Sequence, residues 1–193
     1  MKTRVLVSFP IIVFTVLILT ALPWYQGQAD DSDTSRPKGK VIFEIGQEDK
    51  SDKEFRRSGW MEHTEYSCIV EVDCSTEAFP RYLNRAGYGG GYSDSGVERI
   101  TITFTLNRNY NNIVLRLVRG GAETTVVTVD GKQTHLVTDT MLGSGEGFKV
   151  GIYNLPLGEL VEGTHSIEMT VADDGKGNAT YQWDALSLFA KKR

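Results

Sequence analysis

Apolar side chains alternate with polar ones along much of the chain, and this period of two constrains the fold more than any other feature. In residues 100–106, four apolar side chains alternate with three threonines without a break. Successive side chains of a β-strand point to opposite faces, so the pattern predicts a strand with one face in the core and one in water. We expect further strands at residues 41–45, 66–72, 113–118, 125–129, 132–137, 148–153, 165–171 and 181–189.

No stretch of about a dozen residues keeps the 3.6-residue apolar period of an amphipathic helix, so we expect little helix. Between two of the expected strands, Asp130 and Gly131 supply the left-handed backbone that a tight hairpin turn requires. About eight or nine strands separated by turn residues favour an all-β fold. We predict an antiparallel two-sheet β-sandwich of the jelly-roll kind.

The first 29 residues have the features of an export signal. Lys2 and Arg4 precede an apolar run over residues 5–22, and a small-x-small cleavage sequence ends at Ala29. The alternative is an uncleaved N-terminal anchor, because the run reaches the lower length limit of a membrane span. Under either interpretation, the rest of the chain is exported. We therefore expect a secreted, extracellular or cell-surface protein that contacts a membrane only through such an anchor.

Polar residues 30–40 contain a proline and a glycine and show no apolar period, so we expect a flexible linker there. Residues 41–190 are then one domain. The formal net charge is −4, and it becomes more negative when Lys2 and Arg4 are removed with the signal. Nucleic-acid binding needs clustered Lys and Arg side chains, so we expect no nucleic-acid partner.

Cys68 and Cys74 are the two cysteines of the chain. An exported compartment permits a disulfide, and we predict that the two thiols pair and close the short loop between them. Two free thiols are the alternative, because pairing depends on a geometry that the sequence does not give.

Three short stretches occur in an order and spacing that a known family shares. They are Phe43-Glu44-Ile45-Gly46-Gln47-Glu48-Asp49 followed by Glu54-Phe55, then Leu160-Val161-Glu162-Gly163-Thr164-His165-Ser166-Ile167, and finally Tyr181-Gln182-Trp183-Asp184-Ala185-Leu186-Ser187-Leu188. Together they resemble the C-terminal β-sandwich of the rhamnogalacturonan lyases of polysaccharide lyase family 4 and related carbohydrate-binding modules. This chain departs from the family at His165, where an asparagine is usual, and at Trp183, which stands at the position of a tyrosine.

The resemblance implies a galactose-binding-like jelly roll over residues 41–190, with its first and last strands side by side. It also implies that the domain binds a polysaccharide or oligosaccharide. The chain has no room for the catalytic domains of the lyases, so lyase activity does not carry over.

Sugar-binding jelly rolls of this kind often hold a structural calcium, which takes oxygen ligands. The candidates are the carboxylates of the first and last segments, Glu44, Asp49, Asp52 and Asp184. Asp184 shares the two-residue phase of Leu186 and Leu188, so it faces the core unless a bulge intervenes, and a buried carboxylate needs a partner. In the alternative reading, Asp184 accepts backbone N–H bonds and the other three are solvated turn residues.

Residues 81–92 contain the side-chain types that sugar recognition needs. This segment lacks a regular period and contains Arg81, Tyr82, Asn84, Arg85, Tyr88 and Tyr92. Aromatic faces stack on the apolar side of a sugar ring, and arginines pair with hydroxyls or with a uronate. We expect a binding loop here, with Trp60 as a further contact. The alternative is that these aromatic side chains cover a sheet edge.

Trp183 is expected to face solvent, because its neighbour Asp184 is expected to face the core. A tryptophan on an outer sheet face would be a second stacking platform for a sugar.

Residue patterns typical of catalysis are missing. The chain has no G-x-S-x-G, H-E-x-x-H or phosphate-loop sequence, and its histidines, His63, His135 and His165, are well separated. We expect no enzymatic activity. The predicted function is a non-catalytic carbohydrate-binding module that is secreted or tethered at the surface. The alternative is a structural or adhesive β-sandwich that mediates protein contacts at the cell envelope.

Overall fold

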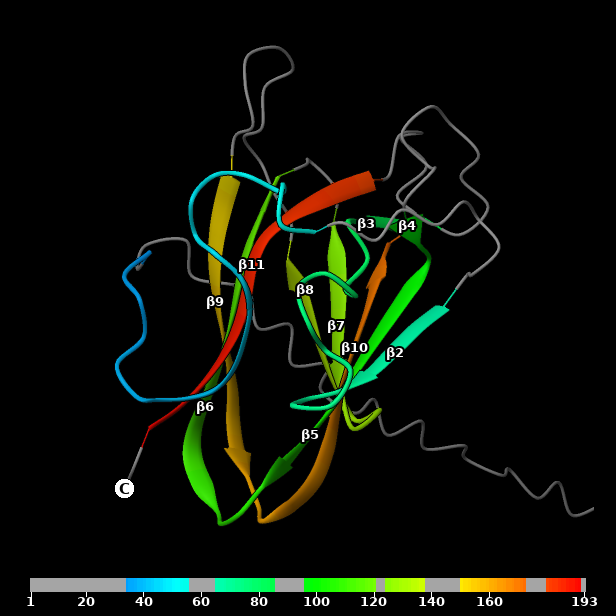
Figure 1. Ribbon diagram of the computed structural model, residues 1–193. Coiled ribbons are helices and arrows are strands. Elements are labelled where there is room, and N and C mark those ends of the chain that lie inside the picture. The colour runs from blue at the N-terminus through cyan, green and yellow to red at the C-terminus, as the bar shows by residue number, and fades with distance from the viewer. Residues whose placement is uncertain are drawn as a thin grey trace, which may run out of the picture.

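The computed structural model describes residues 34–55, 65–85, 96–120, 124–137, 150–172 and 180–191, and these form β-strands joined by turns (Figure 1). The described ranges contain no helix. The strands are β1 (Lys40–Gly46), β2 (Glu65–Ile69), β3 (Tyr82–Asn84), β4 (Gly96–Val97), β5 (Arg99–Leu106), β6 (Tyr110–Gly120), β7 (Thr125–Val129), β8 (Gln133–Val137), β9 (Val150–Leu160), β10 (Gly163–Val171) and β11 (Thr180–Lys191).

The strands form two sheets that pack face to face (Figure 1). Sheet A has the order β2-β5-β10-β7-β8, and sheet B has the order β4-β3-β11-β6-β9, with β1 also paired to β11. From β5 to β11 the chain crosses between the sheets at every step except the β7–β8 hairpin, as in a jelly roll. The predicted two-sheet β-sandwich is therefore confirmed.

Two strand pairs differ from the antiparallel prediction. β2 runs parallel to β5, and β3 runs parallel to β4. Between β2 and β5 the chain forms β3 and β4 of sheet B. This excursion is the crossover connection that a parallel strand pair needs. The sheets are consequently mixed, although most pairs are antiparallel.

β5 shows why the alternating pattern produces this fold. Its apolar side chains are at most 2 % exposed, while its threonines are intermediate or exposed. The buried set is Ile100, Ile102, Phe104 and Leu106. Burying one such side chain contributes about 1.5–3 kcal/mol, so a one-residue slip in register would turn all four to water and is strongly disfavoured.

The first and last strands lie side by side, as the family resemblance implies. β1 pairs antiparallel with β11, and Ile45 lies opposite Leu186 while Gly46 lies opposite Ala185. β6 pairs along the other side of β11. β11 is therefore an interior strand of sheet B, and residues 183–190 are all buried.

A β-bulge at Asp184 changes the phase of β11. Trp183 lies opposite Arg119 and Ala185 lies opposite Val118, so Asp184 is the extra residue. The prediction that Trp183 faces solvent is wrong, because it is 0 % exposed and its ring packs edge-on at 5.7 Å from Phe79. Side chains do not alternate strictly between the two faces here, because the bulge interrupts the period of two.

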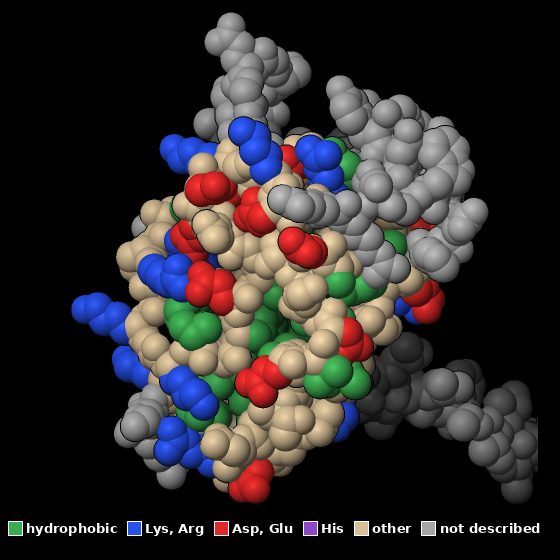
Figure 2. Space-filling model, viewed as in Figure 1, with side chains coloured by type: hydrophobic (Ala, Val, Ile, Leu, Met, Phe, Trp, Pro, Cys, Tyr) green, Lys and Arg blue, Asp and Glu red, His purple; other side chains and the backbone are tan. Residues whose placement is uncertain are grey.

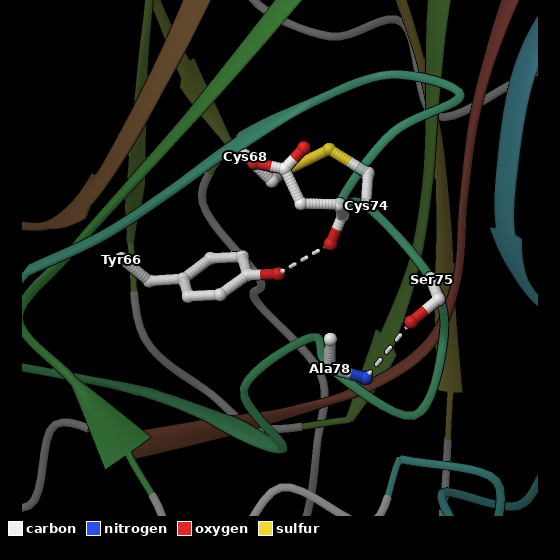
Figure 3. Close-up of a disulfide and its surroundings, with 6 residues drawn as sticks. Tyr66, Cys68, Cys74, Ser75 and Ala78 are labelled. Carbon is white, nitrogen blue, oxygen red and sulfur yellow. Dashed lines mark hydrogen bonds between the residues drawn. A yellow bond between two sulfur atoms is a disulfide. The ribbon is translucent and has the colours of Figure 1, made fainter.

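The disulfide between Cys68 and Cys74 is confirmed, with a Cα–Cα separation of 5.1 Å (Figure 3). It links the end of β2 to the turn that follows. Beside it, the Tyr66 hydroxyl donates to the Asp73 carbonyl oxygen at 3.2 Å, and the Ala78 amide donates to Ser75 Oγ at 3.3 Å (Figure 3). These contacts fix the turn against sheet A.

Removing the disulfide is expected to destabilise the domain by about 2 kcal/mol, the chain-entropy value for a loop this short. The double substitution Cys68→Ala with Cys74→Ala should lower the free energy of unfolding, measured by denaturant titration. Ser67→Ala, at an exposed position of the same strand, is the matched control and should have little effect. Equal stability of the double variant and the parent would contradict this expectation.

His165 joins two turns of sheet A through both of its ring nitrogens. Nδ1 lies 2.8 Å from Asp130 Oδ2, and Nε2 lies 2.8 Å from the Val161 carbonyl oxygen. Both partners are acceptors, so both nitrogens donate only when the ring is protonated. Burial alone would lower the pKa of His165, but these two bonds raise it above its usual value. Burial would likewise raise the pKa of Asp130, yet bonds from His165 and the Ser166 amide hold it below its usual value.

This arrangement predicts a stability that falls as the pH rises through the raised pKa of His165. A raised folded-state pKa means that the histidine contribution is fully present below pH 6.5, the ordinary value, and is lost as the pH passes through the folded-state pKa. The temperature midpoint of thermal unfolding should therefore decrease as the pH rises from 6.5 through the folded-state pKa of His165. Asp130→Asn should flatten the dependence, whereas Thr128→Ser, on the preceding strand, should leave it intact. If the unfolding midpoint of the parent protein does not decrease with pH, His165 is not protonated in the folded state.

Candidate functional site

The segment predicted to bind sugar is only partly described. Arg81, Tyr82 and Arg85 lie within the described residues, while Trp60, Tyr88 and Tyr92 lie outside them. The loop prediction is wrong for Tyr82–Asn84, which form strand β3 and pair with Thr180–Gln182 at the start of β11. Tyr82 is 7 % exposed, and its hydroxyl accepts a hydrogen bond from Gln182 Nε2 at 3.1 Å. Its ring therefore supports β3 and is largely covered.

Arg81 is held in place by a carboxylate and lies beside an aromatic ring. Its Nε donates to Asp52 Oδ2 at 2.6 Å, and its guanidinium carbon lies 5.3 Å from the centre of the Tyr82 ring. The hydrogen bond to Asp52 raises the pKa of Arg81 further. The Arg81 side chain is still 40 % exposed, so a fixed guanidinium meets solvent at this end of the sandwich.

The carboxylates proposed for calcium do not all come together. Glu44 lies on the outer face of sheet B and pairs with Arg36 at 2.7 Å, and Asp52 pairs with Arg81. Asp49 lies near enough to Asp184 for its charge to act on that carboxyl. Within the described ranges, no three His, Cys, Asp or Glu side chains gather in a group that suits a metal.

Asp184 is the most constrained of these carboxylates. It is 1 % exposed, and Oδ1 accepts a hydrogen bond from the Ser51 amide at 2.9 Å. Burial raises the pKa of Asp184, the amides of Ser51, Asp49 and Lys50 oppose the shift, and the Asp49 charge adds to it. Oδ2 is buried and has no hydrogen-bond partner among the described residues. A buried carboxylate oxygen of this kind is a free ligand for a cation.

A third arrangement, on the outer face of sheet B, is not predicted by the sequence. Arg116 on β6 is 3 % exposed and binds Glu48 through two parallel bonds, Nε to Oε1 at 2.8 Å and Nη2 to Oε2 at 2.9 Å. Its Nη1 donates to the carbonyl oxygens of Thr34 and Ser35 and to Asn154 Oδ1, at 3.1, 3.2 and 3.1 Å. The Arg116 hydrogen bond lowers the pKa of Glu48.

Arg116 thus fastens residues 34–38, predicted as linker, to the sheet. Arg36 contributes as well, because it pairs with Glu44 and its guanidinium carbon lies 5.3 Å from the centre of the Phe189 ring. The alternating pattern of residues 113–118 could place Arg116 on the outer face. Nothing in the sequence could identify its partners, which lie 38 to 82 residues away along the chain.

Beside this attachment lies a groove of about 430 Å³. It is lined by Ser35, Arg36, Pro37, Lys38, Asn112, Val114, Phe189 and Lys191. On the face shown in Figure 2, Lys and Arg side chains gather at the lower left, where the N-terminal described segment and the end of β11 lie in Figure 1. The groove combines apolar walls with cationic side chains.

Among the residues described here, no helix is long and apolar enough to cross a bilayer. The predicted signal peptide or anchor, residues 1–29, lies outside the described residues.

Comparisons with known proteins give structural similarities at low sequence identity. No protein-family model and no curated protein matches the chain. A CBM35 from Cellvibrio japonicus is similar over 60 % of this chain and 91 % of its own, with 11 % identity and a TM-score of 0.41. An exo-β-1,3-galactanase from Phanerochaete chrysosporium is similar over 47 % of this chain, with 22 % identity and a TM-score of 0.35. A family GH115 4-O-methyl-α-glucuronidase is similar over 82 % of this chain, with 12 % identity and a TM-score of 0.43.

The chain matches only part of the two enzymes, 21 % of the galactanase and 19 % of the glucuronidase. The specific resemblance to family 4 polysaccharide lyases stays a prediction.

Proposed function

We propose that this protein is a non-catalytic carbohydrate-binding module, secreted or tethered at the cell surface. The observation that carries the proposal is the antiparallel pairing of β1 with β11. The resemblance to the lyase-associated sugar modules requires this neighbourhood, because it links stretches that open and close the domain. The disulfide is consistent with an exported compartment.

The binding surface in this proposal is the end of the sandwich at β3 and the residues that follow it. Arg81 supplies a guanidinium fixed by Asp52, and Arg85 is partly exposed at the other end of β3. Tyr88 and Tyr92 follow in the sequence and would stack on a sugar ring, with Trp60 as a further candidate. The Tyr82 ring is largely buried, so it is not part of the proposed stacking surface.

The test is retention of the full-length protein on a panel of neutral and acidic polysaccharides by affinity electrophoresis. Combining Arg85→Ala, Tyr88→Ala and Tyr92→Ala should weaken retention about tenfold or more, because stacking and charged hydrogen bonds are lost. Arg99→Ala, at an exposed arginine of sheet A, is the control and should bind as the parent does. A parent protein that no polysaccharide retains would overturn the proposed function.

We also propose a structural calcium at the bulge of β11. Asp184 Oδ2 and the carboxylate of Asp49 fit such a site, and nearby backbone carbonyls would complete the six to eight oxygens that calcium takes. Glu44 does not fit, because it is paired with Arg36 on the outer face. Bound calcium would neutralise the buried carboxylate and hold the turn of residues 47–52 against β11.

Calcium should therefore raise the unfolding temperature of the protein. At a concentration about 100 times the Kd, one site adds about 2.7 kcal/mol to the free energy of unfolding. Scanning calorimetry with calcium chloride and then with chelator measures the difference. Asp184→Asn should abolish the calcium response, while Glu44→Gln should retain it. Identical unfolding temperatures of the parent under both conditions would eliminate this metal site.

A second function has one observation in its favour. The turn closed by the disulfide carries two exposed apolar side chains, Ile69 at 52 % and Val72 at 80 %. Exposed apolar side chains gathered in one place can mark a protein contact, as an adhesive β-sandwich at the cell envelope would need. Failure of the polysaccharide panel, together with loss of adhesion on Val72→Ser, would favour this function over sugar binding.

A further inference from the structure

The groove on the outer face of sheet B has an unusual balance of charge. Its lining contains three cationic side chains, those of Arg36, Lys38 and Lys191, and no carboxylate. The chain as a whole is acidic, with a formal net charge of −4. Arg36 is engaged by Glu44, but within the described part of the chain Lys38 and Lys191 have no salt bridge. Two ammonium groups are therefore available to an anion.

The two lysines are brought together by strand pairing. Lys40 at the start of β1 lies opposite Ala190 near the end of β11. Between Lys38 and Lys40 the chain passes so close to β11 that a Cβ at Gly39 would lie 2.7 Å from the Ala190 carbonyl oxygen and 3.4 Å from the Lys191 amide nitrogen. Only a glycine permits this approach, so the residue after Lys38 packs against the end of β11 that carries Lys191, and both lysines line the groove.

The walls of the groove are fixed before any ligand arrives. Arg116 binds the carbonyl oxygens of Thr34 and Ser35, and Asn154 Nδ2 also donates to Ser35 O at 3.0 Å. The opposite wall belongs to sheet B and carries Phe189 and Val114. A site whose walls are held in this way loses little conformational entropy on binding.

We propose that this groove binds a carboxylate-bearing sugar residue of an acidic glycan, an inference that rests on the proposed carbohydrate-binding function. The carboxylate would pair with Lys38 and Lys191, and the amide of Asn112 would bond a ring hydroxyl. Val114, which is half-buried, would meet the apolar face of the ring, while Phe189, buried and covered by Arg36, forms the floor of the groove. A volume of about 430 Å³ lies within the range of roughly 300–1,000 Å³ that is usual for small-ligand sites.

This site is separate from the end of the sandwich at β3. β3 pairs with the start of β11, at Thr180–Gln182, whereas the groove includes Lys191 at its other end. Variants of the two regions can therefore be tested independently.

The experiment measures binding of trigalacturonate, with galactotriose as the neutral counterpart, to the full-length protein by isothermal titration calorimetry. Lys38→Gln combined with Lys191→Gln should weaken trigalacturonate binding about fivefold to tenfold, since two ion pairs are lost. Lys40→Gln combined with Lys132→Gln removes the same charge at exposed lysines that do not line the groove and should leave the affinity unchanged. Lys38→Arg with Lys191→Arg should restore most of it.

The possible results distinguish the acidic-glycan site from a general charge effect and from binding at β3. Selective loss in the groove variant, with binding that weakens as sodium chloride is added, supports the acidic-glycan site. Equal losses in the groove variant and the control variant would show a general charge effect and overturn it. Undiminished binding in the groove variant, with loss on Arg85→Ala, would overturn this site but leave the proposed function standing. If neither trisaccharide nor any polysaccharide of the panel binds, both proposals fail.

Discussion

The position of β11 between β6 and β1 is the constraint on which the rest of the structure depends. An interior strand must satisfy its backbone donors and acceptors on both sides, and β11 does so with β6 along one edge and with β3 and β1 along the other. Its side chains from residue 183 to 190 are buried, so both faces of sheet B are covered there. The core covers one face. Residues 34–38, fastened by Arg116, lie against the other.

The fold class could be predicted because its signal is local and repeated. Alternation in residues 100–106 indicates one buried face, and many short segments of this kind with turns between them leave few architectures. The direction of β2 against β5 could not be predicted, since it depends on a crossover through the other sheet. The orientation of Trp183 was missed for a similar reason. A bulge arises from the pairing of two strands, and one strand alone does not reveal it.

The same holds for the candidate sites. Features that depend on neighbouring residues could be predicted from the sequence, and features that depend on residues far away along the chain could not. Asp184 was identified from the sequence because a carboxylate among apolar residues of a strand is chemically conspicuous. The network of Arg116 was not, because an arginine on an outer face ordinarily meets water and its partners here come from residues 34, 35, 48 and 154. The irregular pattern of residues 81–92 predicts a loop at Tyr82, and its place in a three-residue strand follows from pairing with β11.

The length of β11 has a consequence for how the domain would hold a polymer. The β3 segment lies at its beginning and the cationic groove at its end, roughly 35 Å apart for a strand of this length. A short oligosaccharide cannot reach from one region to the other, whereas a long chain can. Once one contact is made, the second becomes intramolecular, and its strength is set by the effective concentration of the remaining chain. Avidity for long glycans would then come from the spacing that a single strand imposes.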